Sequence, residues 1–137
     1  MPKLAWISVL VAFVAVPALA ESAIPDLRGT WTGESESIVR GPGNPHHRAK
    51  AADEPRLSSA MFTMVIDKQD GRRFSGIWSS PRSTEKIIAV VSRNNAIYLI
   101  DDDGFTVGTL MSPTQIELCY MQQGSARVAS CAVMTKK

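Results

Sequence analysis

The chain has 137 residues, of which 45% are hydrophobic, and a formal net charge of +2 at pH 7 from 15 basic and 13 acidic residues. This length suits one compact domain, and the near balance of charge excludes the strongly basic surface that nucleic-acid-binding proteins use. We therefore expect no nucleic-acid partner.

Residues 1–20 have the pattern of an export signal. Lys3 supplies a positive start, residues 4–16 are apolar except for Ser8, and residues 17–20 end in the small-x-small pattern of a signal-peptidase site. We predict cleavage after Ala20 and a single mature domain, 21–137, in the periplasm or outside the cell. The apolar run is too short for a permanent membrane helix, and no later segment is long enough, so we expect no membrane span in the mature chain.

The mature part contains short runs with β-strand patterning, each bounded by turn residues. The predicted strands cover residues 30–39, 60–67, 73–79, 85–92, 96–101, 105–111, 115–121 and 126–134. Most of the breaks between them are short and carry Gly, Pro, Asn or Asp, as tight turns do. Consecutive strands should therefore be antiparallel neighbours.

The segment 40–59 is different, because it contains three prolines and no strand pattern. We predict a long loop here, with a short helical turn near residues 48–53 as its only regular structure. Loops of this length in a compact domain are commonly functional.

Eight short strands predict an all-β fold, an eight-stranded antiparallel up-and-down β-barrel, because closure removes both edges of the sheet. A two-sheet sandwich is the alternative, but it needs several long connections between sheets and this chain offers one. Phe62, Met64 and Ile66 should point inward, and so should Phe74 and Trp78. For residues 96–101 the pattern leaves the inner face open, because residues 97–100 are all apolar.

Two cysteines remain after the signal, and an even number in an exported chain favours a disulfide. If Cys119 and Cys131 face each other across the last hairpin, the pairing is centred on Ser125, inside a predicted turn. Both side chains then lie on the outer face, so we predict a cross-strand bridge that joins the last two strands.

Gly29-Thr30-Trp31 opens the first predicted strand. A Gly-x-Trp at this place, followed by an eight-strand meander, resembles the lipocalin and avidin group of barrels. The resemblance implies that Trp31 closes one end of the barrel, under Lys136 or Arg127. By position, Ser37 is similar to a serine that contacts biotin in avidins. The asparagine that avidins carry two residues after the tryptophan is Gly33 here, and their later tryptophans have no counterpart, so the resemblance implies the fold and not biotin binding.

The sequence offers little catalytic or metal-binding chemistry. His46-His47 is the only histidine pair, and we interpret it as part of a solvated polar loop and predict no metal site. Asp101-Asp102-Asp103-Gly104 lacks the spaced ligands of an EF-hand and predicts a hairpin turn. Glu34 and Glu36 should face water. With no nucleophile motif, we expect no catalytic residues, no cofactor and no enzyme activity.

The barrel lumen is then the remaining place for function, with a filled core at the Trp31 end and a shallow cavity at the other. The predicted ligand-contacting residues are Ser35, Ser37, Phe62, Met64, Phe74, Trp78, Leu118, Tyr120 and Ser130, a mostly apolar set with a few hydroxyls. Our leading hypothesis is a protein that binds a small, largely apolar ligand at the open end, with the 40–59 loop as a lid. The alternative is a cell-envelope protein-binding module, such as a protease inhibitor or stress factor, that uses this loop and has a solid core.

Overall fold

The computed structural model describes residues 23–47 and 53–137, and the predicted signal peptide and most of the turn expected near 48–53 lie outside these ranges. The described part contains strands and no helix, so it holds no helical segment able to cross a membrane. The strands are β1 (Gly29–Arg40), β2 (Arg56–Asp70), β3 (Arg73–Ser79), β4 (Thr84–Val91), β5 (Ala96–Ile100), β6 (Phe105–Ser112), β7 (Gln115–Gln122) and β8 (Arg127–Lys136).

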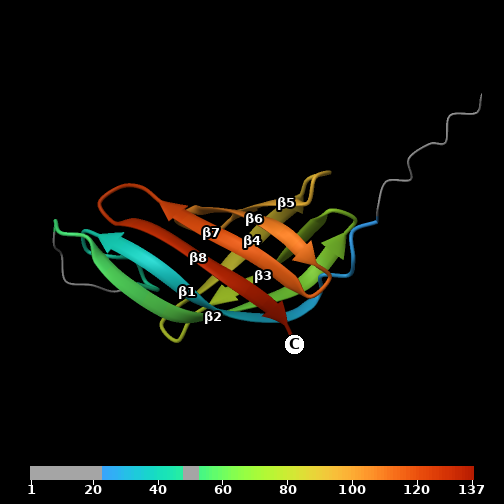
Figure 1. The fold of residues 1–137 in the computed structure, drawn as a ribbon, viewed down its shortest axis with the longest axis horizontal. Coiled ribbons are helices and arrows are strands. Elements are labelled where there is room, and N and C mark those ends of the chain that lie inside the picture. The colour runs from blue at the N-terminus through green and yellow to red at the C-terminus, as the bar shows by residue number, and fades with distance from the viewer. Residues whose placement is uncertain (1–22, 48–52) are drawn as a thin grey trace, which may run out of the picture.

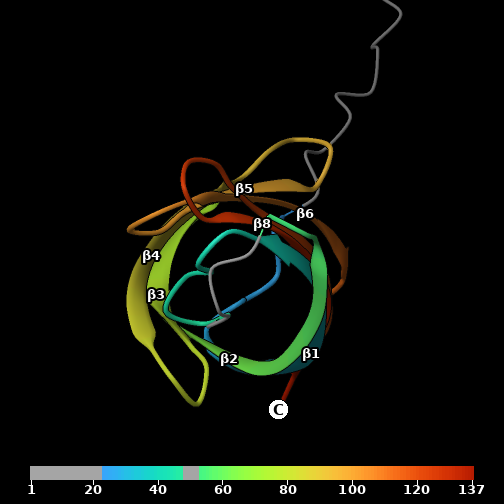
Figure 2. The same ribbon diagram turned by 90° about the vertical axis from the view of Figure 1, so that its left-hand side faces the viewer.

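These strands form one closed antiparallel barrel in which each strand pairs with its neighbours along the chain (Figure 1). β1 pairs with β2 on one side and with β8 on the other, which closes the sheet into a cylinder. The view along the axis in Figure 2 shows the ring of strands from the end where β1 stops. The predicted all-β up-and-down barrel is therefore confirmed.

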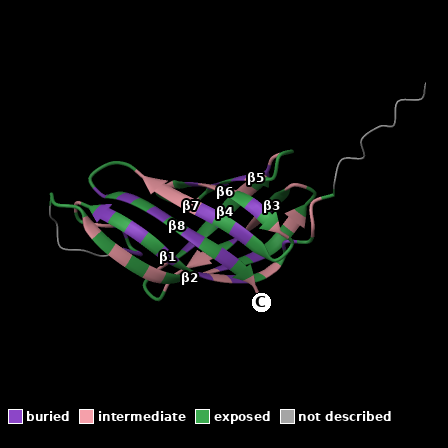
Figure 3. Cartoon of the chain, in the orientation of Figure 1, coloured by how far each residue is buried: buried purple, intermediate pink, exposed green. Residues whose placement is uncertain are grey.

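Side chains alternate between the core and solvent along each strand, as the striped colouring in Figure 3 shows. Phe62, Met64 and Ile66 are buried as predicted, because a period of two places them on one face of β2. In β5, where the sequence left the faces open, Ile97 and Leu99 are buried while Tyr98 and Ile100 are exposed.

β2 is longer than the sequence indicated. We expected the loop after the first strand to run to residue 59, but residues 56–59 already pair with β1, from Val39↔Arg56 to Glu36↔Ser59. This stretch lacks the apolar alternation of a core strand because its inner face meets polar loop atoms. Nδ1 of His47, for example, lies 3.3 Å from Oγ of Ser58.

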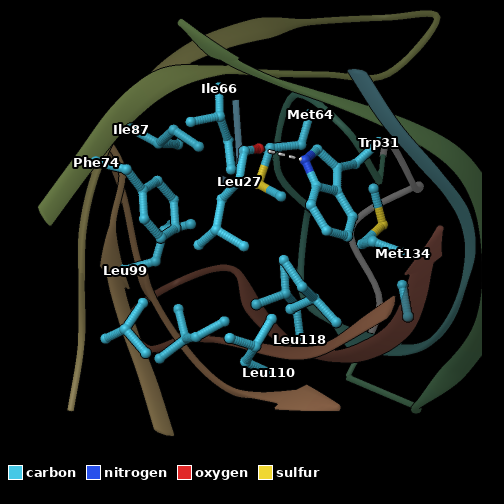
Figure 4. Packing of buried hydrophobic residues seen from close by; sticks show 14 of the residues in the cluster. Leu27, Trp31, Met64, Ile66, Phe74, Ile87, Leu99, Leu110, Leu118 and Met134 are labelled. Carbon is cyan, nitrogen blue, oxygen red and sulfur yellow. Dashed lines mark hydrogen bonds between the residues drawn. The ribbon is translucent and has the colours of Figure 1, made fainter. Parts of the chain in front are cut away.

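The end of the barrel where β1 begins is filled and sealed. Trp31 is fully buried, and its indole N–H donates a 2.8 Å hydrogen bond to the carbonyl of Leu27, which lies across the barrel end (Figure 4). The Nζ of Lys136 lies 5.7 Å from the centre of the Trp31 ring and donates to the carbonyl of Asp26 at 2.7 Å. Gln69 accepts from the Leu27 amide at 2.7 Å, so the segment before β1 is fixed to both β2 and β8.

The Cys119–Cys131 disulfide is confirmed, with the two residues directly opposite each other in the β7–β8 pairing and their Cα atoms 4.1 Å apart. Cys131 is exposed and Cys119 partly exposed, so the bridge lies on the outer surface. Disulfides persist in oxidising compartments, which supports a non-reducing, exported environment.

Replacing both cysteines, Cys119→Ala with Cys131→Ala, should lower the free energy of unfolding by about 3 kcal/mol, because the unfolded chain loses a cross-link over a short loop. Urea unfolding followed by circular dichroism measures this change. The wild-type protein under a reductant should match the double variant. A difference below about 1 kcal/mol would contradict the role we give to the bridge.

Lys136→Ala should destabilise the barrel by about 1–2 kcal/mol, because it removes a charged hydrogen bond and a cation–π contact at the sealed end. Lys137→Ala is the matched control, since it removes the same charge one residue later without touching Trp31, and it should stay within about 0.5 kcal/mol of wild type. Equal melting curves for the two variants would show that the lysine does not hold the sealed end together.

Candidate functional site

The opposite end of the barrel contains a small cavity, covered by residues 41–47, which we call the mouth segment. This segment crosses the barrel opening in Figure 2. The space that the centre of a water molecule can occupy is about 20 Å³, enough for about one water. The cavity is lined by Ser35, Asn44, His46, His47, Phe62, Trp78, Glu85, Asp101, Thr106, Leu118, Tyr120, Ser130 and Ala132.

Aromatic rings form one wall of this cavity. Phe62 and Trp78 come from the paired strands β2 and β3 and stack with their ring centres 4.9 Å apart. His46 and His47 both lie against Phe62, at 5.2 Å and 5.7 Å between ring centres. The two histidines therefore cover the aromatic wall from the solvent side.

Both histidines are buried, with exposed fractions of 6% for His46 and 3% for His47. Our interpretation of this pair as part of a solvated loop is therefore wrong. The sequence could not show the burial, because it depends on the loop folding back into the barrel opening and not on any local pattern. Burial lowers the pKa of each imidazole, which favours the neutral form of both rings.

Asn44 fixes the mouth segment in this conformation. Its side-chain oxygen accepts hydrogen bonds from the amides of His46 (3.1 Å) and His47 (2.8 Å), and its Nδ2 donates to Oε1 of Gln122 at 3.0 Å. The turn that carries both histidines is thus tied to β7 through a single side chain. Arg56 adds a second tie, because its Nη2 donates to the carbonyl of Gly41 at 2.7 Å.

A group of acidic side chains lies at the rim beside His46. Nδ1 of His46 is hydrogen-bonded to Oγ of Ser80 at 2.7 Å, and Nε2 lies 3.3 Å from Oε1 of Glu85. Burial, and then the nearby charges of the acidic turn 101–103, raise the pKa of Glu85 to about 7. A carboxyl group held this way is partly protonated at neutral pH, which is unusual for glutamate.

The turn between β5 and β6 carries the other acidic groups. Asp101 accepts hydrogen bonds from the amides of Asp103 (3.3 Å) and Gly104 (2.8 Å), and burial raises its pKa. The hydroxyl of Tyr120 donates to Asp103 at 2.7 Å. A Cβ on Gly104 would approach the Tyr120 ring to 2.4 Å, so the absence of a side chain there lets the ring reach the turn. The hairpin turn predicted at this place is present, but it also borders the cavity.

Hydroxyl groups line the inner wall on β1 and β8. Oγ of Ser37 donates to Oγ of Ser130 at 2.7 Å and lies 3.3 Å from Oγ of Ser35. Ser35 and Ser130 border the cavity, whereas Ser37 does not. These hydroxyls satisfy one another, which allows them to be buried among apolar neighbours.

The structure brings six of the nine predicted ligand-contacting residues to the cavity: Ser35, Phe62, Trp78, Leu118, Tyr120 and Ser130. The other three do not border it. Ser37 lies on the inner face of β1 and is hydrogen-bonded to Ser130 beside the cavity, whereas Met64 and Phe74 belong to the packed core. Among the residues that the structure describes, the deep part of the lumen is packed and the cavity lies at the mouth.

Sequence reasoning missed Asn44, the two histidines, Glu85, Asp101, Thr106 and Ala132. A usable signal existed for Glu85, because it shares its strand parity with the buried Ile87 and therefore faces inward. Thr106 likewise lies on the inner face of β6. For the loop residues the sequence carried no comparable signal.

The contacts of His46 also bring a serine and a carboxyl group to one imidazole, as in hydrolases that activate a serine nucleophile. Here Nε2 of His46 makes no hydrogen bond with Glu85, so the carboxyl group does not orient the ring. The hydroxyl of Ser80 accepts from the Arg82 amide at 3.3 Å. This geometry does not support a serine nucleophile.

Comparisons with protein-family models, curated proteins and solved structures find no match to this chain. The site must therefore be interpreted from its own geometry.

Asn44→Ala should speed amide hydrogen exchange at His46 and His47 by about tenfold or more, because both amides lose their acceptor and the mouth segment loses its tie to β7. Exchange measured by NMR or mass spectrometry tests this. Asn94→Ala, in the turn between β4 and β5, is the control and should leave these two amides unchanged. Unaltered exchange in the Asn44 variant would show that other contacts hold the segment.

Proposed function

We propose that this protein is an exported barrel that binds a small, mostly apolar ligand at its mouth, with the mouth segment as a lid. One observation carries the proposal: the roof over the stacked Phe62 and Trp78 rings is a loop segment and not barrel wall. A loop held by a few side-chain hydrogen bonds can move without breaking the barrel, whereas a wall strand cannot.

The walls suggest the chemistry of the ligand. Below the lid the cavity is bounded by Phe62, Trp78, Leu118 and Ala132, which favour an apolar or aromatic body. Ser35, Thr106 and Ser130 add hydroxyls that can fix its orientation. Small-molecule sites commonly combine an apolar lining with a few placed polar groups.

The size of the cavity implies that the lid must move. A space of about 20 Å³ accepts a water molecule and no organic ligand. Moving His46 and His47 outward would expose the face of Phe62 that they now cover and extend the cavity to the barrel rim. The described conformation is then the closed state, and binding selects an open one.

The family and location fit this proposal. A closed eight-stranded meander, Trp31 at the sealed end and Lys136 over its ring support a place among lipocalin- and avidin-like barrels. The disulfide supports a periplasmic or secreted protein. Biotin is not the ligand we propose, because the Ser37 hydroxyl is hydrogen-bonded to Ser130 and does not border the cavity.

A second candidate is an envelope protein-binding module, and two observations favour it. The lumen is packed below the mouth, and Leu57, just after the loop, is 88% exposed. Exposed Asp53 and Glu54 lie beside it and would give such a surface an acidic edge. Leu57 pairs with Ile38 of β1, which is 47% exposed, and exposed apolar residues next to a long loop are typical of a contact site for another protein.

The ligand proposal can be tested with indole, which matches an aromatic wall and has one N–H donor. Calorimetry should show saturable binding of one indole per chain. Ala132→Leu adds bulk to the cavity wall and should weaken binding about tenfold or more, because overpacking costs about 1–3 kcal/mol. Ala129→Leu, on the outer face of β8, is the matched control and should bind like wild type.

Native mass spectrometry of the protein from its own host adds an independent readout. A retained small molecule that Ala132→Leu releases would support the proposal, provided that the variant keeps the wild-type circular dichroism spectrum. Absence of both indole binding and a retained molecule would overturn it. A co-purifying protein lost on Leu57→Ser, with no small ligand, would favour the second candidate.

A further inference from the structure

Three carboxylates converge at the rim of the mouth from separate parts of the barrel. Glu85 is the second residue of β4, whereas Asp101 and Asp103 lie in the turn between β5 and β6. One oxygen of each lies within 4.8 Å of the others. Glu85 is only 8% exposed and Asp101 is partly buried, so water screens their mutual repulsion poorly. Such a cluster is costly unless a proton or a cation offsets the charge.

His46 gives an independent indication of what is bound there. Its ring is 94% buried, since only 6% is exposed, and Nε2 has no hydrogen-bond partner although it lies 3.3 Å from Oε1 of Glu85. Leaving a buried polar nitrogen unpaired costs about 1–3 kcal/mol. The other nitrogen is engaged with Oγ of Ser80 at 2.7 Å. A histidine that ligates a metal has the same arrangement, with one nitrogen held by an outer partner and the other free.

The tautomer explains the unpaired nitrogen. If Nδ1 donates its proton to Ser80, then Nε2 presents a lone pair toward Glu85, and the ionised form of Glu85 repels it unless a proton or a cation lies between them. Asp101 and Asp103 each bring an oxygen within 4.8 Å of an oxygen of Glu85, so Glu85 connects the ring to the acidic turn. An ion shared by the imidazole and the carboxylates removes both unfavourable features at once.

We propose that Glu85, Asp101 and Asp103 form a binding site for a divalent transition-metal ion, with Zn²⁺ as the best fit and His46 as a further ligand beside Glu85. Nε2 of His46 lies 3.3 Å from Oε1 of Glu85 but outside the group of carboxylate oxygens within 4.8 Å of one another, so binding would draw the ring toward the acidic turn. A mixed set of one imidazole nitrogen and carboxylate oxygens is typical of zinc and manganese sites, whereas calcium and magnesium take oxygen ligands alone. This site goes beyond small-ligand binding and does not depend on it. The sequence analysis predicted no metal because the four residues belong to three segments that only the closed barrel brings together.

The proposed ion would also fasten the lid. His46 belongs to the mouth segment, whereas the three carboxylates belong to the barrel rim. A bond from the ion to both would hold the segment over the cavity. The metal-loaded protein should therefore exchange the amides of His46 and His47 at least about tenfold more slowly than the metal-free protein.

The test is calorimetric titration of the untagged, exported protein, stripped with EDTA and dialysed, with Zn²⁺, Mn²⁺, Ca²⁺ and Mg²⁺ separately. We expect one Zn²⁺ per chain, bound at least about tenfold more tightly than Ca²⁺. Glu85→Gln and Asp103→Asn keep the shape of each side chain and should each weaken Zn²⁺ binding by about tenfold or more. Asp102→Asn is the matched control, because it removes the same charge from an exposed neighbour outside the cluster.

The outcomes separate cleanly. No Zn²⁺ binding, or tighter binding of Ca²⁺ than of Zn²⁺, would overturn the proposal. Equal weakening by Asp102→Asn and Asp103→Asn would also overturn it, since that result reports diffuse attraction to an acidic rim. His46→Gln should weaken Zn²⁺ binding while leaving weak Ca²⁺ binding unchanged, and this second variant keeps the test valid if Glu85→Gln fails to fold. Loss of indole binding in the earlier experiment would not affect any of these results.

Discussion

Pairing of β1 with both β2 and β8 is the constraint on which the rest of this structure depends. Once the sheet is closed, every second residue must point into a narrow cylinder, and in this barrel buried side chains fill most of it. The interior therefore becomes a column of limited length. A binding site that is not part of this packed interior must therefore lie at one of the two ends of the barrel.

The two ends of the barrel are closed by chemically different groups. At the sealed end, the segment before β1 closes the cylinder with apolar groups, and its backbone polar groups are paired with Trp31, Gln69 and Lys136. At the mouth, the covering segment places two imidazoles and an amide over the cavity, and Nε2 of His46 lies 3.3 Å from Oε1 of Glu85. An apolar seal is stable and needs no ligand, whereas a buried cluster of titratable groups is costly and is typical of a functional site.

The sequence predicted the barrel well because its signals are local. Alternation with a period of two identifies inner faces from a few consecutive residues, as for Phe62, Met64 and Ile66 in β2. The disulfide was predictable for the same reason, since pairing about Ser125 needs only the hairpin itself. Where apolar residues occupied both parities, in residues 97–100, alternation carried no information and only the packed structure separated the faces.

The site was predictable only in part, because strand residues follow a periodic pattern and loop residues do not. Residues on strands, such as Trp78 and Tyr120, could be assigned to the lumen from their strand parity. Parity does not tell how deep in the barrel a side chain lies. Met64 and Phe74 were therefore expected at the site, although they belong to the core. Residues such as His46 and Asp101 reach the mouth because loops fold over the rim, and no periodic pattern records that path.

The lid links the two proposed activities of the mouth. His46 would be a metal ligand in the closed conformation, and the same ring covers the aromatic wall that a small organic ligand would need. An ion that holds the segment down and a ligand that requires it to lift favour different conformations of one loop. By thermodynamic linkage each would then lower the affinity for the other by the same factor. A barrel whose core is solid can in this way couple metal occupancy to access at its mouth, with a single short segment as the element that both equilibria share.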